Sequence, residues 1–184
     1  MKTAITGGIG SGKSYVCRLL RQQGIDVYDC DAAAKRLMRQ SPMLRQQLTD
    51  LIGPDAYSAE GLLNKAAVSR FLLASPQNAA AISAIVHPAV AADFMESGHE
   101  WMECAILFES GFDRLVDRVI VVTAPEEVRL CRIVQRDGIT REQAAEWMSR
   151  QLPQQEVRRR ADMEIVNDGN ADLDRQIASI IVSK

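Results

Sequence analysis

The residues of this chain best suited to phosphate chemistry lie in one glycine-rich segment near its start. The segment reads Gly7-Gly8-Ile9-Gly10-Ser11-Gly12-Lys13-Ser14 and matches G-x-x-x-x-G-K-[ST], the pattern of a phosphate-binding loop, or P-loop. Glycines let the backbone curl so that successive N–H groups converge on phosphate oxygens, and the following helix adds positive potential. Lys13 then reaches the β- and γ-phosphates, and Ser14 is a ligand for Mg²⁺. The pattern predicts a nucleotide site.

The alternative interpretation of this segment is a glycine-rich turn between a strand and a helix, with Lys13 on the surface. The dinucleotide-binding fingerprint G-x-G-x-x-G is excluded, because its third glycine would have to stand at position 13.

Acidic residues follow two of the expected strands. Asp29 and Asp31 come directly after the second strand, whose carboxyl end shares the crevice of the P-loop in a parallel sheet. A carboxylate there accepts a proton from a substrate hydroxyl or holds a magnesium-bound water; the alternative is a helix N-cap. No clear hydrophobic run ending in an aspartate supplies a magnesium-binding acid of the Walker B type. The third expected strand ends in Glu109 instead, a candidate for binding Mg²⁺ or substrate, or a solvated strand end.

Arginines are concentrated in the last third of the chain, although the net charge is −2. They are Arg129, Arg132 and Arg136 on one expected helix, followed by Arg141, Arg150, Arg158, Arg159 and Arg160. Small-molecule kinases use a mobile arginine-bearing lid to clamp phosphates and exclude water. The alternative for any one arginine is a solvated helix face.

Composition narrows the class of protein. The chain has 184 residues, 47% hydrophobic and 25% charged, as in ordinary globular proteins, and it lacks the basic excess of a general nucleic-acid binder. Its longest unbroken apolar run, Cys104–Phe108, is far shorter than the roughly 18 residues of a membrane span, and no signal peptide is apparent. Four cysteines without a C-x-x-C pair indicate reduced thiols. We expect a cytoplasmic protein with no nucleic-acid or membrane partner; nothing indicates its oligomeric state.

Strand and helix signals alternate at both ends of the chain, which predicts a parallel α/β sheet. One helix is expected over Tyr15–Gln23. A second helix is expected to end near Asp137, a third to begin near Arg141 after a capping box at Thr140, and the last to begin at about Ala171. The five expected strands are Thr3–Thr6, Ile25–Tyr28, Trp101–Phe108, Arg118–Val122 and Met163–Val166.

The stretch from about Ala32 to Gly98 shows no convincing strand. Ser75-Pro76 is typical of an N-cap followed by proline at the first helical position, and Pro54 and Gly61 bound a loop. We expect several helices inserted between the second and third strands.

Several sequence segments, taken in their order along the chain, resemble those of the dephospho-CoA kinase family. The resemblance spans essentially the whole chain. The chain departs from the family's usual residues at Tyr15, Cys30, Ala105 and Arg129, where Thr, Ala, Pro and Gln are usual, and none of these changes removes a group that the reaction needs. The matching residues are Thr6 with the P-loop, Asp29-Cys30-Asp31, His87-Pro88, Ile106-Leu107-Phe108-Glu109, Arg136-Asp137-Gly138, Gln151, Ala161-Asp162 and Asn167-Asp168-Gly169.

The resemblance implies a fold and a reaction. The fold is the α/β, three-layer fold of P-loop NTPases with a five-stranded parallel sheet. Residues 1–31 and 99–184 form the kinase core, with a lid at about 126–160, and residues 32–98 form a helical CoA-binding insertion. The implied reaction is ATP-dependent phosphorylation of the ribose 3′-hydroxyl of dephospho-CoA, the last step of coenzyme A biosynthesis.

The resemblance also implies roles for individual residues. Asp31 is the catalytic base, with Lys13 and Arg136 as further catalytic residues, and Ser14 holds Mg²⁺, the cofactor that accompanies ATP. The substrate-binding residues are Asp29, Asp31, His87 and Glu109. The ATP-binding residues are Gly8, Ile9, Gly10, Ser11, Gly12, Lys13, Ser14, Tyr15, Arg136 and Asn167.

Two other functions fit the P-loop. A nucleoside or nucleotide kinase would use the same core to phosphorylate a 5′ group; His87-Pro88 in the insertion and the Asp-x-Asp pattern argue against it. A nucleotide-switched binding protein would usually carry a base-reading N-K-x-D motif, and the sequence has none.

Overall fold

The computed structural model describes residues 1–182, and the chain divides into two compact units. One unit consists of Met1–Tyr28 together with the chain from His99 onward, and the other is Asp29–Gly98. Each unit is built on its own secondary structure, a β-sheet with flanking helices in the first and helices alone in the second.

A five-stranded parallel sheet forms the frame of the first unit, and its strand order is β2-β3-β1-β4-β5. The central strand β1 pairs with β3 on one side and with β4 on the other, so the loop that follows β1 leaves from the middle of the sheet. The strands are β1 (Thr3–Thr6), β2 (Val27–Asp29), β3 (Trp101–Glu103), β4 (Arg118–Thr123) and β5 (Met163–Val166).

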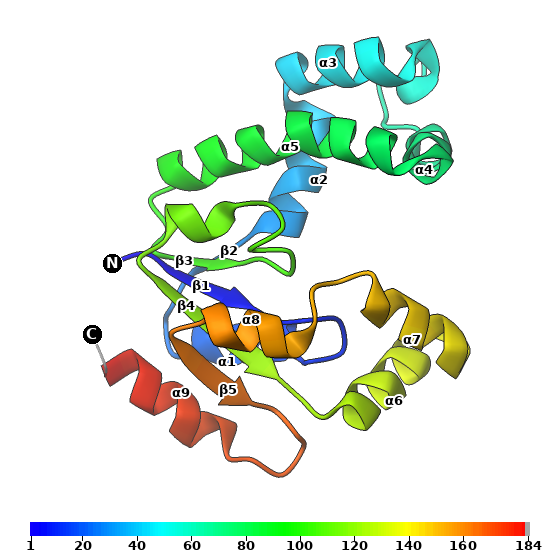
Figure 1. The fold of residues 1–184 in the computed structure, drawn as a ribbon. Coiled ribbons are helices and arrows are strands. Elements are labelled where there is room, and N and C mark those ends of the chain that lie inside the picture. Colours follow the sequence, from blue (N-terminus) through cyan, green and yellow to red (C-terminus); the bar gives the residue numbers. More distant parts are fainter. Residues whose placement is uncertain (183–184) are drawn as a thin grey trace. The chain divides into compact units, whose positions relative to one another are not determined.

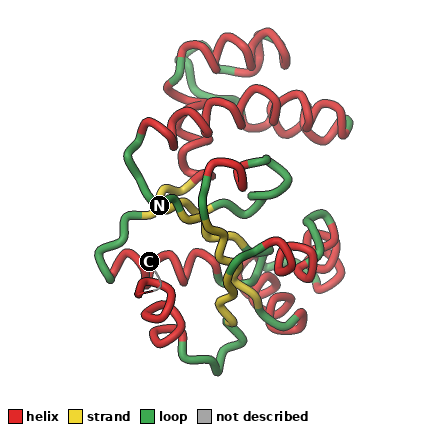
Figure 2. The backbone as a smooth tube through the Cα atoms, turned by 60° about the vertical axis from the view of Figure 1, so that its left-hand side comes forward, coloured by secondary structure: helices red, strands yellow, loops and turns green. Residues whose placement is uncertain are grey.

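Helices cover both faces of this sheet, which gives the expected three-layer α/β fold. Helix α1 (Lys13–Gln22) and helix α9 (Leu173–Val182) pack against one face, where Ile5, Ile120 and Ile165 are buried with side chains of both helices. Helix α8 (Gln154–Arg160) packs against β4, and Figure 1 shows α8 in front of the sheet and α1 behind it. Figure 2 shows the same strands in yellow between helices drawn in red.

Helix α6 (Glu126–Asp137) and helix α7 (Arg141–Ser149) form a small separate core beside the P-loop. Leu130, Ile133 and Ala144 are buried there, and the Ile9 side chain of the P-loop packs against them. Gly138 ends α6 in the left-handed region at φ 65°, and Thr140 forms the predicted capping box with Gln143.

The second unit is helical throughout, as the sequence predicted for this stretch, apart from an isolated antiparallel bridge between Tyr57 and Leu63. Ser75 accepts a hydrogen bond from the Asn78 N–H, so the predicted N-cap is confirmed. Its four α-helices are α2 (Cys30–Gln40), α3 (Pro42–Ile52), α4 (Lys65–Ala74) and α5 (Pro76–Glu96), and a short 3₁₀ helix spans Pro54–Ala56.

One of these helices, α5, is long and apolar enough to cross a membrane by length and composition alone. Within the unit it packs against α2, α3 and α4, and Val86, Val90 and Phe94 are buried. A helix at the centre of a helical unit needs the same apolar composition. The absence of a membrane partner stays a prediction.

The third strand is shorter than predicted. We expected it over Trp101–Phe108, but β3 ends at Glu103. After it the chain turns: the Ser110 N–H donates to the Ile106 carbonyl and the Phe112 N–H to the Leu107 carbonyl. Leu107 is buried without being in a strand, so the apolar run reflects burial of a turn rather than pairing in the sheet.

Candidate active site

The P-loop connects the central strand β1 to helix α1, the setting that its sequence pattern requires. Gly12 stands directly before α1 in the left-handed region at φ 88°, and a Cβ built on it would lie 2.0 Å from Asn167 Nδ2. That amide nitrogen donates to the Ser11 carbonyl at 2.9 Å. Asn167 therefore holds the loop from the end of β5, and only glycine fits at position 12.

Lys13 and Ser14 meet a buried carboxylate at the end of the neighbouring strand β3. Lys13 Nζ lies 2.5 Å and Ser14 Oγ 2.7 Å from Glu103 Oε1. Glu103 is 7% exposed, so all three polar groups satisfy one another in a largely buried setting. Ile5 of β1 pairs with Glu103 in the sheet register, which places the carboxylate beside the strand that leads into the P-loop.

The local charges keep Glu103 ionised. Burial pushes the pKa of its carboxyl upward, but the Lys13 ammonium and hydrogen bonds from Lys13, Ser14 and Cys17 bring the pKa below its ordinary value. The Cys17 thiol shows the opposite effect, because burial and the nearby Glu103 charge raise its pKa. The site thus holds an ammonium–carboxylate pair with a neutral thiol beneath it.

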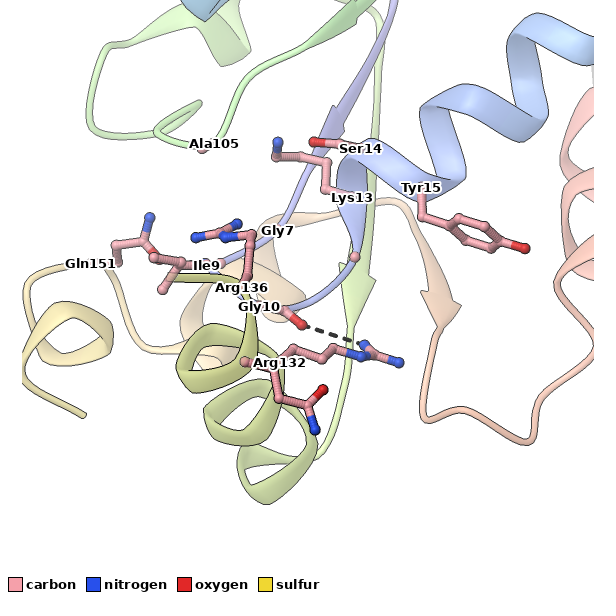
Figure 3. A pocket seen from close by; sticks show the side chains of 13 residues that line it. Gly7, Ile9, Gly10, Lys13, Ser14, Tyr15, Ala105, Arg132, Arg136 and Gln151 are labelled. Atoms are coloured by element: carbon pink, nitrogen blue, oxygen red, sulfur yellow. Dashed lines mark hydrogen bonds between the residues drawn. The ribbon is translucent and has the colours of Figure 1, made fainter. Parts of the chain in front are cut away.

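A cavity of about 660 Å³ opens over the P-loop. Figure 3 shows Lys13 and Ser14 from α1, Arg136 from α6 and Gln151 from the α7–α8 segment around the same space. The cavity is lined by Gly7, Gly8, Ile9, Gly10, Gly12, Lys13, Ser14, Tyr15, Ala105, Arg132, Gln135, Arg136 and Gln151. Most of the predicted ATP-binding residues thus line one cavity.

Arg132 ties the P-loop to the segment that contains Asn167. Its guanidinium donates to the carbonyl oxygens of Gly10 and Ser11, each at 3.3 Å, and to the Asn167 carbonyl at 3.0 Å. Figure 3 shows the hydrogen bond to Gly10 as a dashed line. Asn167 does not line the cavity itself; it supports the loop from behind through Ser11.

Arg136 lines the cavity, and its guanidinium also pairs with the neighbouring Asp137. Arg136 Nη2 lies 2.7 Å from Asp137 Oδ2, and the hydrogen bond raises the pKa of Arg136. The arginine side chain is 61% exposed, so this pair is held weakly in solvent. The position of Arg136 is compatible with both roles that the sequence allowed, binding of a phosphate and a surface ion pair.

The predicted substrate residues of the second unit occupy three different settings. Asp29 caps α2, because its Oδ1 accepts from the Ala32 N–H at 2.9 Å. Asp31, in the first turn of α2, is exposed and pairs with Lys35 at 2.5 Å. His87 lies on α5 one residue before Pro88, and burial lowers the pKa of its imidazole.

Two further predicted residues differ from the rest. Glu109 does not end a strand as expected; it is exposed in the turn after β3, and its Oε1 accepts from the Leu152 N–H at 3.3 Å. Tyr15 lines the rim of the cavity but is 46% exposed, and the Arg18 guanidinium lies 5.2 Å from its ring centroid.

Glu103 is the residue that sequence reasoning missed. Because the expected strand ran on to Phe108, the search for an acid at its end stopped at Glu109 instead. One feature of the sequence could have identified Glu103. It follows the short apolar pair Trp101-Met102, on a strand expected to lie in the same sheet as the P-loop strand.

Comparisons with known proteins identify the family of this chain. Residues 1–172 match the dephospho-CoA kinase family. A dephospho-CoA kinase from Bacteroides fragilis is 40% identical over 98% of this chain and 91% of its own length. A crystal structure from Thermus thermophilus, 33% identical, covers the whole chain and 97% of its own with a TM-score of 0.85.

A shikimate kinase from Aquifex aeolicus shares the fold at 16% identity, over 100% of this chain and 95% of its own, with a TM-score of 0.56. The P-loop between β1 and α1, the five-stranded parallel sheet and the nearly full-length match lead to one family. The chain belongs to the dephospho-CoA kinase family, which phosphorylates dephospho-CoA in the final step of coenzyme A biosynthesis.

Proposed function

We propose that this chain transfers the γ-phosphoryl group of ATP to the ribose 3′-hydroxyl of dephospho-CoA, with Asp31 as the general base. The observation that carries the proposal is the cluster of Lys13, Ser14 and Glu103 at the head of a P-loop cavity. In this mechanism Lys13 balances charge on the β- and γ-phosphates, and catalysis comes mainly from positioning and electrostatics.

The residues around the P-loop fit Mg²⁺ bound together with ATP. No group of three or more His, Cys, Asp or Glu side chains within residues 1–182 forms a metal site, so the protein supplies few ligands. Ser14 Oγ and the Glu103 carboxylate offer the oxygens that Mg²⁺ prefers, and phosphates provide others. When bound, Mg²⁺ neutralises charge on the phosphates.

Asp31 is proposed to accept the proton of the 3′-hydroxyl while that oxygen attacks the γ-phosphorus, and ADP leaves. Support comes from its chemistry and its place: it follows β2, a strand of the same sheet as the P-loop strand. Its ion pair with Lys35 is solvent-exposed, and such pairs contribute only about 0–1 kcal/mol, so substrate can displace it.

The other predicted residues complete the proposal. Arg136 binds the transferring phosphoryl group from α6. Residues 32–98 hold dephospho-CoA and include His87, while Asp29 and Glu109, outside this range, contribute to the same substrate site. Residues 126–160 act as the lid, and the enzyme works in the cytoplasm.

The direct test is the substitution Asp31→Asn, compared with Asp29→Asn. An amide at position 31 keeps the shape but cannot take the proton, so kcat should fall about 10²–10⁴-fold while the affinity for ATP changes little. Asparagine caps helices as well as aspartate does, so Asp29→Asn should retain most of kcat if capping α2 is the main role of Asp29. Initial rates of ADP formation with Mg-ATP and dephospho-CoA measure both.

The same assay separates the proposal from its alternatives. Dephospho-CoA, AMP, CMP and no acceptor are supplied in parallel, and ADP is followed. Turnover of AMP or CMP in preference to dephospho-CoA would identify a nucleotide kinase. Equal kcat losses, or a larger loss in Asp29→Asn, would remove Asp31 from the role of base.

A further inference from the structure

Both backbone polar groups of Ile9 in the P-loop are held by residues from outside the loop. Its N–H donates to Gln151 Oε1 at 2.7 Å, and its carbonyl accepts from Arg129 Nε at 2.9 Å. Arg129 belongs to α6, and Gln151 to the segment between α7 and α8. The conformation of Ile9 therefore depends on two side chains that lie more than a hundred positions away in sequence.

Arg129 is a buried cation that forms none of the ion pairs found within residues 1–182. It is 6% exposed. Burial lowers its pKa, and the charge of the nearby Glu126 offsets this only in part. Because an unpaired buried charge is costly, a purely structural role would be served better by a neutral side chain.

The P-loop backbone closes around this arginine. A Cβ on Gly8 would lie 2.5 Å from Arg129 Nη2, and a Cβ on Gly10 would lie 2.7 Å from the Arg129 carbonyl oxygen. The two glycines thus allow α6 to approach the loop from behind. Ile9, between them, packs its side chain against Leu130 and Ile133 of the α6–α7 core.

Arg129 is not among the residues that line the cavity over the P-loop; its guanidinium contacts the backbone of the loop instead. Its outer side faces a second cavity of about 700 Å³, which is lined by Pro125, Met148 and Leu152 among others. A shorter side chain at position 129 would therefore border open space instead of creating a sealed void.

We infer that Arg129 is a positioning residue for ATP binding, which acts through the backbone of Ile9. Its Nε–H fixes the Ile9 carbonyl, the side-chain amide oxygen of Gln151 fixes the Ile9 N–H, and together they fix the curl that turns the following N–H groups toward phosphate. Its unpaired charge adds positive potential behind the loop. The inference rests on the proposed function only in taking ATP as the nucleotide.

The test compares Arg129→Met and Arg129→Lys with the control Arg175→Met, an exposed arginine on α9. Methionine removes both the donor and the charge, whereas glutamine, the family's usual residue at this position, would keep an N–H donor. Calorimetry with Mg-ATP and no acceptor gives Kd, steady-state rates give both KM values and kcat, and thermal melting gives Tm. Losing a charge-assisted hydrogen bond should raise Kd and KM for ATP about 10–100-fold in Arg129→Met. The KM for dephospho-CoA should stay unchanged, and Arg129→Lys should recover part of the loss through its charge.

An unchanged Kd for ATP in Arg129→Met, with or without a lower Tm, would overturn the inference and leave Arg129 a merely structural residue. If the wild-type protein itself fails to bind ATP, the proposed function is wrong. This result is distinguishable from failure of the inference about Arg129, in which the wild type binds ATP and the Arg129 variant binds it equally well.

A second variant covers the case in which Arg129→Met does not fold. Gly8→Ala places a methyl group against Arg129 Nη2 and should displace the guanidinium, because the far end of an arginine side chain yields more easily than backbone. Its loss of ATP affinity should resemble that of Arg129→Met, and the double variant should lose no more than either single one. If the two losses of ATP affinity were fully additive, Gly8→Ala would not act through Arg129 and the inference would be overturned.

Discussion

At the scale of single residues, the acid that matters most to the P-loop is Glu103. Its carboxylate accepts from Lys13 and Ser14, the two residues that the motif assigns to phosphate and metal. The Lys13 side chain is 13% exposed and that of Glu103 is 8% exposed, so the pair is largely desolvated. In such a pair each charge depends on the other, because neither is well solvated alone.

We therefore predict that Glu103→Gln destabilises the protein, because it leaves the Lys13 ammonium without its counter-charge. Breaking one side of a buried pair costs about 3–5 kcal/mol, whereas removing both charges costs less. The double variant Glu103→Gln with Lys13→Met should therefore be more stable than Glu103→Gln alone. Denaturant unfolding of the three proteins measures the difference.

The pH dependence of stability provides an independent test of the Lys13–Glu103 pair. Since the pKa of Glu103 is depressed in the folded protein, its stabilising effect is complete above its ordinary value of 4.5 and is lost as pH falls through the depressed value. The Tm of the wild type should fall more steeply in acid than that of Glu103→Gln. Parallel curves for both proteins would show that the carboxylate adds nothing to stability.

At the scale of elements, helix α6 carries three arginines with three different surroundings. Arg129 lies behind the P-loop at Ile9, Arg132 binds Gly10, Ser11 and Asn167, and Arg136 lines the cavity. The sequence predicted the cluster, because arginine density and helical spacing are visible in it. It does not reveal this division, because spacing defines a helix face and not the partner opposite each position.

The end of α6 carries the prediction for Arg136. Arg136→Lys keeps the charge but loses the planar fork that binds two oxygens at once, so kcat should fall, and Arg136→Ala should lower it further. Because the side chain is exposed, the Tm should change by no more than a few degrees in either variant. Rates at saturating ATP and dephospho-CoA decide the role.

Asp137→Asn is the matched control, since it removes the carboxylate that pairs with Arg136 in the structure. If Arg136 serves the transferring phosphate, this variant should keep kcat. Unchanged kcat in Arg136→Ala would instead leave the arginine as half of a surface ion pair.

Local signals explain which elements the sequence could predict. The five strands and the helices that alternate with them could be predicted from short apolar runs bounded by glycines and polar residues. The helix caps at Thr140 and Ser75 could be predicted because each depends only on residues close in sequence. The residue at which β3 ends is not determined by local composition. Ile106 and Leu107 are typical of strands, but their carbonyls accept turn hydrogen bonds from the N–H groups of Ser110 and Phe112. Glu103 was missed for the same reason.

At the scale of the whole molecule, a helical unit is inserted in the chain between the two parts of a sheet-based unit. The first unit contains the complete P-loop cavity, and the second contains Asp31 and His87. We predicted that these parts bind different substrates, ATP in the core and dephospho-CoA in the helical insertion. Each ligand should then stabilise mainly the unit that holds it.

Hydrogen exchange with each substrate alone tests this division. A ligand at 100 times its Kd stabilises the bound state by about 2.7 kcal/mol, which slows exchange up to about 100-fold at amides that open only without it. Mg-ATP should slow exchange in the P-loop, α6 and the segment around Asn167, and dephospho-CoA should slow it in α2 and α5. In Lys13→Ala the protection by ATP should be lost and that by dephospho-CoA kept. If dephospho-CoA protected only the sheet-based unit, the helical unit would not be the substrate-binding part, and the roles proposed for Asp29 and His87 would be wrong.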